Sequence, residues 1–349
     1  MSTGPTEAAP PLRRARVVMF HRKPTQHVFS IEQVFELVRS QLPDRFEPVV
    51  AVSSHPSRGI LPRVRSIREA RGRQGDVNHV VGDVNFLALG LDGARTVLTV
   101  HDCEFLERAG RLKSWIYRWV WLRLPIRRSR IITVPTEAVR EEVLRHVSLD
   151  RDRIRVIPDP VAPVFSPTAR PFRIEEPVIL QVGTRSNKNL ERVVRALEGI
   201  PCRLVVIGPL TADQRRLLAA CRVRYEQLLD LSIDEVARCY RDCDLVIFAS
   251  TAEGFGLPIL EAQASGRPLV VGDHPPLPEV AGDGACLVDP IDVSSIRAGI
   301  RRVIDDADYR EGLVRMGVQN VARFDATAIA ERYAAVYDEI VATVRASSS

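Results

Sequence analysis

Two glutamates flank a glycine-rich turn in the stretch Glu253-Gly-Phe-Gly-Leu-Pro-Ile-Leu-Glu261. The stretch follows an apolar run, residues 244–250, of the kind that forms a buried parallel strand. Gly254 and Gly256 permit a sharp turn and a close approach of a ligand, and Pro258 suits the first turn of a helix. We therefore expect a strand, a tight loop and a helix over about residues 257–265, which Gly266 ends.

This arrangement predicts several polar groups around one point. The main-chain amides near Phe255, Gly256 and Leu257 would lie at a helix N-terminus, which attracts anions. Glu253 would lie in the loop before them, and Glu261 in the first turns of the helix. Such a site suits a ligand with both a phosphate and sugar hydroxyls, although an ordinary connection between a strand and a helix has the same composition.

A second candidate loop carries positive charge. Gly183 ends the apolar run 178–182, and Arg185 and Lys188 follow within five residues. Lysine offers a compact charge and arginine a planar fork, so both are suited to holding a diphosphate. The chain has only three lysines among its 49 basic residues, so the need for a positive charge alone does not explain a lysine here.

Strand and helix patterns alternate along the chain and predict an α/β fold with two doubly wound, Rossmann-like domains. Residues 158–167 carry four prolines without a regular pattern, which is typical of a linker. Ligands of such sheets bind beyond the carboxyl ends of the strands, so a central cleft between the domains is the expected site. The expected strands are 16–20, 46–52, 77–81, 96–100, 131–134, 153–157, 178–182, 203–207, 245–248 and 269–271, and capping boxes predict helices that begin near Ser30 and Ser232.

Composition sets limits on the class of protein. The net charge of +5 and the pI near 9.0 are compatible with anionic substrates, and we find no nucleic-acid-binding module. The six cysteines are scattered, which indicates buried thiols in a reducing compartment; a metal site at Cys239 and Cys243 is the weaker alternative. Without a signal peptide or an apolar run of about 20 residues, we expect a cytoplasmic protein, or one peripheral to the inner face of a membrane.

Two further segments are rich in basic residues. Residues 111–130 combine all three tryptophans of the chain with seven basic residues. This pattern fits a helix at a membrane interface, but it fits equally a helix packed on its own sheet. The loop 20–27 is basic and could contact an acidic or phosphorylated acceptor, or could be a solvated turn.

The pair of glutamates and the residues between them resemble the donor-site signature of glycosyltransferase family 4, whose members are retaining GT-B enzymes that use nucleotide sugars. The resemblance continues through residues 262–271, 277–282 and 286–290. Upstream it includes Gly183 with Lys188, and the segments 97–102 and 155–158. It therefore covers most of the chain from about residue 76.

The resemblance implies a role for each residue of the site. Lys188 would bind the diphosphate, with Arg185 helping from one position beyond the arginine of many relatives, where this chain has Thr184. Glu261 would accept hydrogen bonds from both ribose hydroxyls, and Glu253 would contact the transferred sugar. The amides of residues 254–257 would hold the sugar and the distal phosphate, and His101 would bond to the donor sugar. Gly82 and Asp83 are weaker candidates on the acceptor side.

We thus expect a retaining hexosyltransferase that needs no metal and no cofactor. It would transfer a mannose- or glucose-type sugar from a nucleoside diphosphate to a hydroxyl of a glycan, lipid-linked or small-molecule acceptor. The alternatives are a phosphorylase or epimerase of the same fold and a non-catalytic subunit that binds nucleotide sugars. The expected organisation is a disordered tail (1–13), an acceptor-side domain (14–165), a donor-binding domain (166–325) and a terminal helix (326–349) that crosses back to the first domain.

Overall fold

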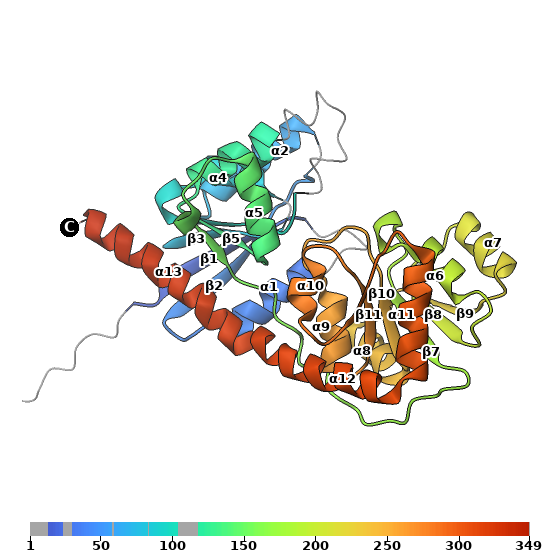
Figure 1. The fold of residues 1–349 in the computed structure, drawn as a ribbon. Coiled ribbons are helices and arrows are strands. Elements are labelled where there is room, and N and C mark those ends of the chain that lie inside the picture. Colours follow the sequence, from blue (N-terminus) through green and yellow to red (C-terminus); the bar gives the residue numbers. More distant parts are fainter. Residues whose placement is uncertain (1–12, 24–29, 58, 83, 104–117, 349) are drawn as a thin grey trace, which may run out of the picture. The chain divides into compact units, whose positions relative to one another are not determined.

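The computed structural model describes residues 13–23, 30–57, 59–82, 84–103 and 118–348 (Figure 1). The chain divides into two compact units. The first comprises residues 1–99, 119–132 and 330–349, and the second comprises residues 100–118 and 133–329, insofar as these ranges are described. The domain boundaries that the sequence suggests, near residues 165 and 325, stay predictions.

The first sheet has six strands in the order β2-β1-β3-β4-β5-β6. β1 pairs in parallel with β2 and β3, and β3 with β4. The loops after β1 and β3 therefore leave the same edge of the sheet from neighbouring strands. The strands are β1 (Ala15–His21), β2 (Phe46–Val52), β3 (Val77–Val80), β4 (Thr96–Thr99), β5 (Ile131–Val134) and β6 (Ile154–Val156), all of them predicted from the sequence.

Helices and short helical turns connect these strands. Thr136 caps the N-terminus of α5 by accepting a hydrogen bond from the Val139 amide. The helices are α1 (Ser30–Ser40), α2 (Ile60–Arg71), α4 (Leu124–Arg128) and α5 (Glu137–His146); the short turns are η1 (Asn85–Gly90), η2 (Gly93–Arg95), η4 (Arg118–Arg123) and η5 (Arg151–Arg153).

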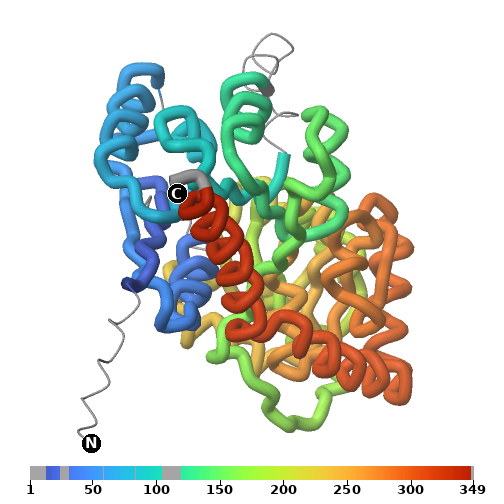
Figure 2. The backbone as a smooth tube through the Cα atoms, turned by 90° about the vertical axis from the view of Figure 1, so that its left-hand side faces the viewer, coloured from blue at the N-terminus to red at the C-terminus, as the bar shows by residue number. Residues whose placement is uncertain are grey.

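The last helix, α13 (Ala326–Ser348), is continuous and is drawn in red at the end of the chain (Figure 2). Its residues from Ala330 onward belong to the first unit. There the ring of Tyr333 lies 5.7 Å from that of Phe35 on α1, and the Tyr337 hydroxyl lies 2.8 Å from Nδ1 of the buried His79 on β3. Aromatic packing and one buried hydrogen bond thus fix this helix to the first unit.

The second sheet has the strand order β12-β11-β10-β7-β8-β9, and all its neighbouring strands are parallel. Read from β9, this is the order of a Rossmann fold, in which the direction of winding reverses between β7 and β10. Two of these strands, β9 and β12, were not predicted. The strands are β7 (Val178–Val182), β8 (Arg203–Ile207), β9 (Arg224–Leu228), β10 (Leu245–Phe248), β11 (Leu269–Gly272) and β12 (Cys286–Val288).

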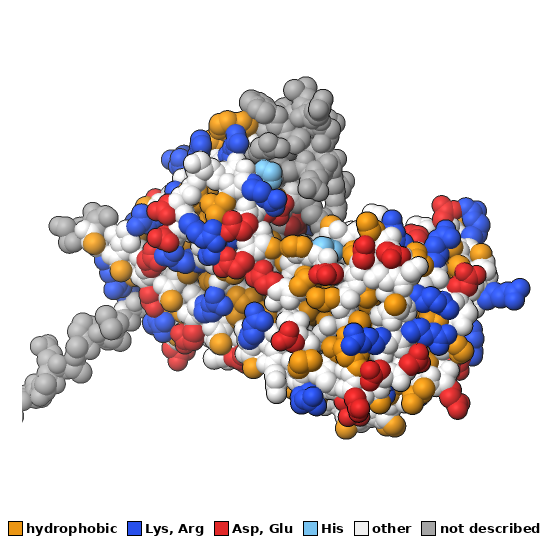
Figure 3. Space-filling view, viewed as in Figure 1, with side chains coloured by type: hydrophobic (Ala, Val, Ile, Leu, Met, Phe, Trp, Pro, Cys, Tyr) orange, Lys and Arg blue, Asp and Glu red, His pale blue; other side chains and the backbone are white. Residues whose placement is uncertain are grey.

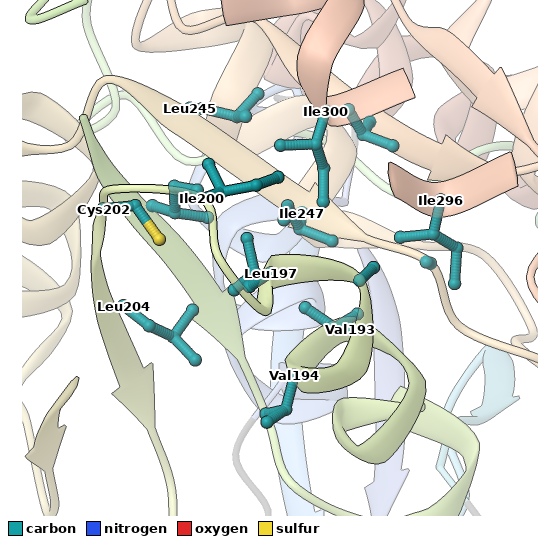
Figure 4. Packing of buried hydrophobic residues seen from close by; sticks show 14 of the residues in the cluster. Val193, Val194, Leu197, Ile200, Cys202, Leu204, Leu245, Ile247, Ile296 and Ile300 are labelled. Atoms are coloured by element: carbon teal, nitrogen blue, oxygen red, sulfur yellow. The ribbon is translucent and has the colours of Figure 1, made fainter. Parts of the chain in front are cut away.

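Helices cover both faces of the second sheet because its inner strands carry buried apolar side chains on both sides. On one face, Leu197 of α6 and Ile300 of α11 pack with Ile247 of β10 (Figure 4). On the other face, α8, α9 and α10 pack around Phe248. The helices are α6 (Leu190–Leu197), α7 (Ala212–Ala220), α8 (Ile233–Asp242), α9 (Leu257–Ala264), α10 (Leu277–Ala281), α11 (Val293–Asp305) and α12 (Ala307–Val321); short turns are η6 (Ser186–Lys188) and η7 (Ala322–Phe324).

Two sequence signals predicted helix ends correctly in the second unit. Ser232 and Glu235 form the reciprocal bonds of a capping box at the start of α8. α9 begins at Leu257 and is followed by Gly266 in the left-handed region, with a φ of 66°. On the face of this unit seen in Figure 3, acidic and basic side chains are intermixed.

Candidate active site

Two loops of the second unit leave the sheet side by side, one after β7 and one after β10. These strands are hydrogen-bonded neighbours at the reversal of winding, where open α/β sheets bind their ligands. The first loop carries Gly183, Arg185 and Lys188, and the second carries Glu253 to Gly256. The structure therefore brings together the two motifs that the sequence placed 65 residues apart.

Hydrogen bonds hold the two loops against each other. The Asn187 amide group donates to the carbonyl of Ala252 at 3.0 Å, and the Thr251 amide donates to the carbonyl of Asn187 at 2.8 Å. Asn189 has a left-handed backbone and donates to the carbonyl of Ala249 at 2.9 Å. Hydrogen bonds from the half-buried Asn187 and the buried Asn189 thus fix the main chain of the two loops relative to each other.

Lys188 and Glu253 form an ion pair, with Nζ 2.6 Å from Oε1. The Lys188 and Glu253 side chains are only 19% and 13% exposed. The ammonium also lies 4.7 Å from the centroid of the buried Phe248 ring. The Lys188 stem runs across Gly183, where a Cβ would lie 3.0 Å from Cγ of the lysine. Within the described residues this lysine makes its charge-assisted bond to Glu253, and a phosphate would have to replace or share that bond.

The loop after β10 needs its two glycines for different reasons. A Cβ at Gly254 would lie 2.6 Å from the carbonyl oxygen of His101, so any side chain there would clash with main chain. Gly256 has a φ of 108°, which other residues rarely adopt. Phe255 is buried and its ring contacts that of Phe324 at 6.0 Å, so this residue has only its main chain to offer a ligand.

The amides of Phe255, Gly256 and Leu257 donate to no other residue within the described part of the chain. They precede and open α9, and Pro258 follows them in its first turn. Free amides at a helix N-terminus form a ready site for an anion. The predicted anion site therefore has its donors in place.

Glu261 lies in α9 and accepts a hydrogen bond from the hydroxyl of Tyr240 at 2.6 Å. Burial raises the pKa of the Glu261 carboxyl, while the bond from Tyr240 and the charge of Lys188 act against that rise. The same burial and the adjacent carboxylate raise the pKa of Tyr240, which therefore stays a donor. Sequence reasoning missed Tyr240, because its position on α8 gives no sign that the phenol reaches α9.

His101 follows β4 and belongs to the second unit, as do Gly254 and Asp159. Its Nδ1 lies 3.9 Å from a carboxylate oxygen of Asp159, and both side chains are nearly buried. Burial raises the pKa of Asp159, and the histidine acts against that rise. Asp159 was not predicted; its only signal was an acidic residue between two prolines, Pro158 and Pro160.

The remaining residues named from the sequence differ in their exposure and surroundings. Thr184 is buried and bonds to the carbonyl of Pro209 at 2.5 Å, whereas Arg185 is exposed at the start of η6. Gly82 follows β3 with a φ of 68°, as expected at a tight loop. Asp83 lies outside the described residues.

The basic and aromatic segment 111–130 is described from residue 118 onward. The Trp121 ring lies 5.1 Å from that of Phe86, and Leu122 and Ile126 are fully buried. The described part of the segment therefore packs on its own unit along one face. Its predicted contact with a membrane stays a prediction.

Among the described residues no group of three or more histidines, cysteines or carboxylates is placed to hold a metal ion. None of the described helices is both long and apolar enough to cross a bilayer.

Solved structures identify the class of fold. The chain is similar to HepE from Anabaena in complex with UDP-glucose, with a TM-score of 0.77 and 16% identity over 93% of this chain and 100% of that one. It is also similar to sucrose-phosphate synthase from Thermosynechococcus elongatus, with a TM-score of 0.75 and 17% identity over 94% and 100% of the two chains. Together with the two parallel six-stranded sheets, these similarities show the GT-B fold.

Sequence comparisons identify the family. Residues 13–164 match the family described as Glycosyltransferase Family 4, and residues 167–319 match Glycosyl transferases group 1. The chain is 30% identical to an MMP alpha-(1->4)-mannosyltransferase from Mycolicibacterium hassiacum over 82% of this chain and 77% of that protein. It is 26% identical to O-antigen chain mannosyltransferase B from Escherichia coli over 66% of each. The chain belongs to glycosyltransferase family 4 and is an enzyme of that class.

Proposed function

We propose that this glycosyltransferase is a retaining hexosyltransferase that takes its sugar from a nucleoside diphosphate sugar and needs no metal ion. The observation that carries the proposal is the cluster of Lys188, Glu253 and Glu261 beside three free amides at the junction of β7 and β10. A single cation, free main-chain donors and two carboxylates match the needs of a diphosphate joined to two sugars.

The diphosphate lies between Lys188 and the amides of residues 255–257 in this proposal. The lysine exchanges Glu253 for a phosphate oxygen, and the helix N-terminus holds the phosphate nearer the transferred sugar. Arg185 is exposed, with a side chain long enough to reach a phosphate as well. These donors offset the charge that develops on the leaving group, which is the task a metal ion performs in other enzymes.

The two carboxylates then bind the two sugars of the donor. Glu261 accepts the ribose hydroxyls, and the bond from Tyr240 fixes its orientation. Glu253, released from Lys188, accepts hydroxyls of the transferred hexose. His101 donates to the same hexose, and its position against Gly254 places it near the donor loop.

The anomeric configuration is retained if the acceptor attacks the anomeric carbon on the same face from which the leaving group departs. The bond between the anomeric carbon and the phosphate oxygen breaks while the acceptor oxygen bonds to the same face of that carbon. The acceptor proton passes to the leaving phosphate, so no other base is required. Lys188 and the free amides stabilise the phosphate in this step.

Relatives support a hexose, and mannose in particular. Several proteins with related sequences are named mannosyltransferases, among them the relative that is 30% identical. The name of the HepE complex includes UDP-glucose, which supports a nucleotide sugar as the donor class. The acceptor is proposed only as a hydroxyl group of a glycan, a lipid-linked sugar or a small molecule.

A panel of donors tests the proposal. GDP- and UDP-linked mannose and glucose vary the base and the sugar separately, and thermal unfolding reports binding, since a ligand at 100 times its Kd adds about 2.7 kcal/mol. We expect one donor to stabilise the protein and to be hydrolysed or transferred with retention, as NMR of the anomeric proton shows. Stabilisation by every nucleoside diphosphate without any turnover would instead indicate a binding subunit, and an inverted product would refute the mechanism.

A further inference from the structure

Helix α2 begins with three large apolar side chains in water. Ile60 is 82% exposed, Leu61 61% and Val64 38%. The residue before the helix is Gly59, which makes no side-chain cap, and the first turn contains no acidic residue. Single exposed apolar residues are ordinary, but three on one turn of one helix indicate a surface that meets something apolar.

The same part of the first unit concentrates the positive charge of the chain. Residues 60–71 carry four arginines and one glutamate, for a net charge of +3. Residues 119–130 carry four arginines and no acid, for a net charge of +4. The whole chain has a net charge of +5, so these two segments hold +7 and the remainder is −2.

The two segments form one surface. The guanidinium of Arg63 on α2 stacks on the Trp121 ring at 3.9 Å. Arg65 and Arg68 on α2 are exposed, and so are Leu124, Arg127 and Arg128 on α4, which we group with the three apolar residues as the α2–α4 surface.

The position of α2 in the fold shows at which edge of the first sheet this surface lies. The helix starts after the carboxyl end of β2, so its first turn lies at the edge of the sheet from which the loop with Gly82 also leaves. That is the edge at which open α/β sheets receive ligands.

We propose that the α2–α4 surface docks the enzyme on an anionic lipid bilayer. Exposed arginines attract anionic head groups, and aliphatic side chains on a helix terminus insert into the interface below them. Trp121 is not the anchor, because it is stacked against Phe86 and Arg63. A nucleic acid would match the charge, but Ile60, Leu61 and Val64 offer no ring on which a base can stack. The proposal goes beyond the transfer reaction and does not depend on the donor.

Co-sedimentation with vesicles tests it without any substrate. We expect the protein to sediment with vesicles that contain phosphatidylglycerol, to stay in solution with phosphatidylcholine alone, and to be released by salt. Arg65→Gln with Arg68→Gln should lower the partition constant by about 25-fold, since each basic residue near the surface contributes a factor of about five. Ile60→Ser with Leu61→Ser should lower it by about tenfold.

Matched variants on the second unit serve as controls. Ile174→Ser with Ile291→Ser removes apolar side chains of similar exposure, 60% and 67%, and should leave sedimentation unchanged. Arg195→Gln with Arg215→Gln removes two exposed arginines there and should change it far less than the α2 pair.

Three results would overturn the proposal. The first is wild-type protein that stays in solution with anionic vesicles at low salt. The second is a lowered unfolding temperature for Ile60→Ser with Leu61→Ser, since that would mean that the chain itself covers these side chains. The third is sedimentation that is the same for all four variants, or a preference for a soluble polyanion such as single-stranded DNA over vesicles.

Discussion

The ion pair between Lys188 and Glu253 predicts an unusual effect of removing a carboxylate from the site. With Glu253→Gln, a free nucleoside diphosphate should bind more tightly than it does to the wild type. In the ligand-free site the ammonium is already paired at 2.6 Å, and the carboxylate that holds it repels phosphate. The amide oxygen of glutamine carries no negative charge and holds the ammonium more weakly, so the charge of the lysine becomes available.

The size of the effect follows from the burial of the pair. A hydrogen bond between charged groups contributes about 1.5–3 kcal/mol, and these side chains, 19% and 13% exposed, are only partly screened by water. If the contact between Lys188 and the diphosphate gains about half of the upper figure of about 3 kcal/mol once the carboxylate is gone, the Kd falls about tenfold, which is about 1.4 kcal/mol. Lys188→Ala should do the opposite and weaken binding by about 1.5–3 kcal/mol, because a charge-assisted contact is lost.

Isothermal titration calorimetry with UDP and GDP at fixed ionic strength measures both changes. Glu176→Gln is the matched control, because Glu176 pairs with Arg224 on the surface of the same unit and its loss changes the net charge equally. Affinity in this control should equal that of the wild type. Weaker or unchanged diphosphate binding by Glu253→Gln would refute the competition between carboxylate and phosphate. The intact donor should gain less than the free diphosphate, since it loses a contact to its sugar.

Three further predictions follow from the other contacts of the site. The pKa of Glu261 is raised in the folded protein, so the free energy of unfolding falls as the pH rises from about 4.5 through that raised pKa. Glu261→Gln should therefore unfold at a higher temperature than the wild type at pH 7 and at the same temperature at low pH. The variant should also lose nucleotide affinity. A lower unfolding temperature at pH 7 would contradict this. Asp159→Asn should lower kcat by about 10-fold to 100-fold with little change in KM, because the His101 ring loses the carboxylate that faces its Nδ1; an unchanged kcat would limit Asp159 to a structural role. Activity should survive dialysis against a chelator, and its loss with recovery on adding Mg²⁺ would show that a metal replaces the proposed donors.

The sequence predicted the sheets well where strands are buried on both faces. β10 is apolar throughout and β7 is apolar except for the buried Gln181, and short runs of this kind suit a strand buried on both faces. β9 was missed because it lies at the edge of the sheet, where Arg224, Tyr225 and Glu226 are exposed and give no pattern. β12 was missed because it has only three residues, of which Leu287 is 40% exposed. Edge strands pair through main chain, which side-chain patterns do not record.

The candidate site was predictable to the level of the loops. Glycines and charges after two neighbouring strands predicted where Lys188 and Glu253 would lie. Their contact was not predictable, because it depends on how two loops 65 residues apart in the chain pack together and on the path of the lysine stem over Gly183. Tyr240 reaches Glu261 from another helix, and no local pattern reports such a distance. Roles that depend on side-chain pairing therefore need the structure.

The contact between Gly183 and the stem of Lys188 has a consequence for how this chain can evolve. Arginine supplies 46 of the 49 basic residues, so a lysine is rare in this chain. Position 188 nevertheless carries lysine, and a larger residue at position 183 would press on the lysine's Cγ, Cδ and Cε. The two positions should therefore vary together among descendants of this sequence, and a lineage that loses the glycine should lose the lysine as well.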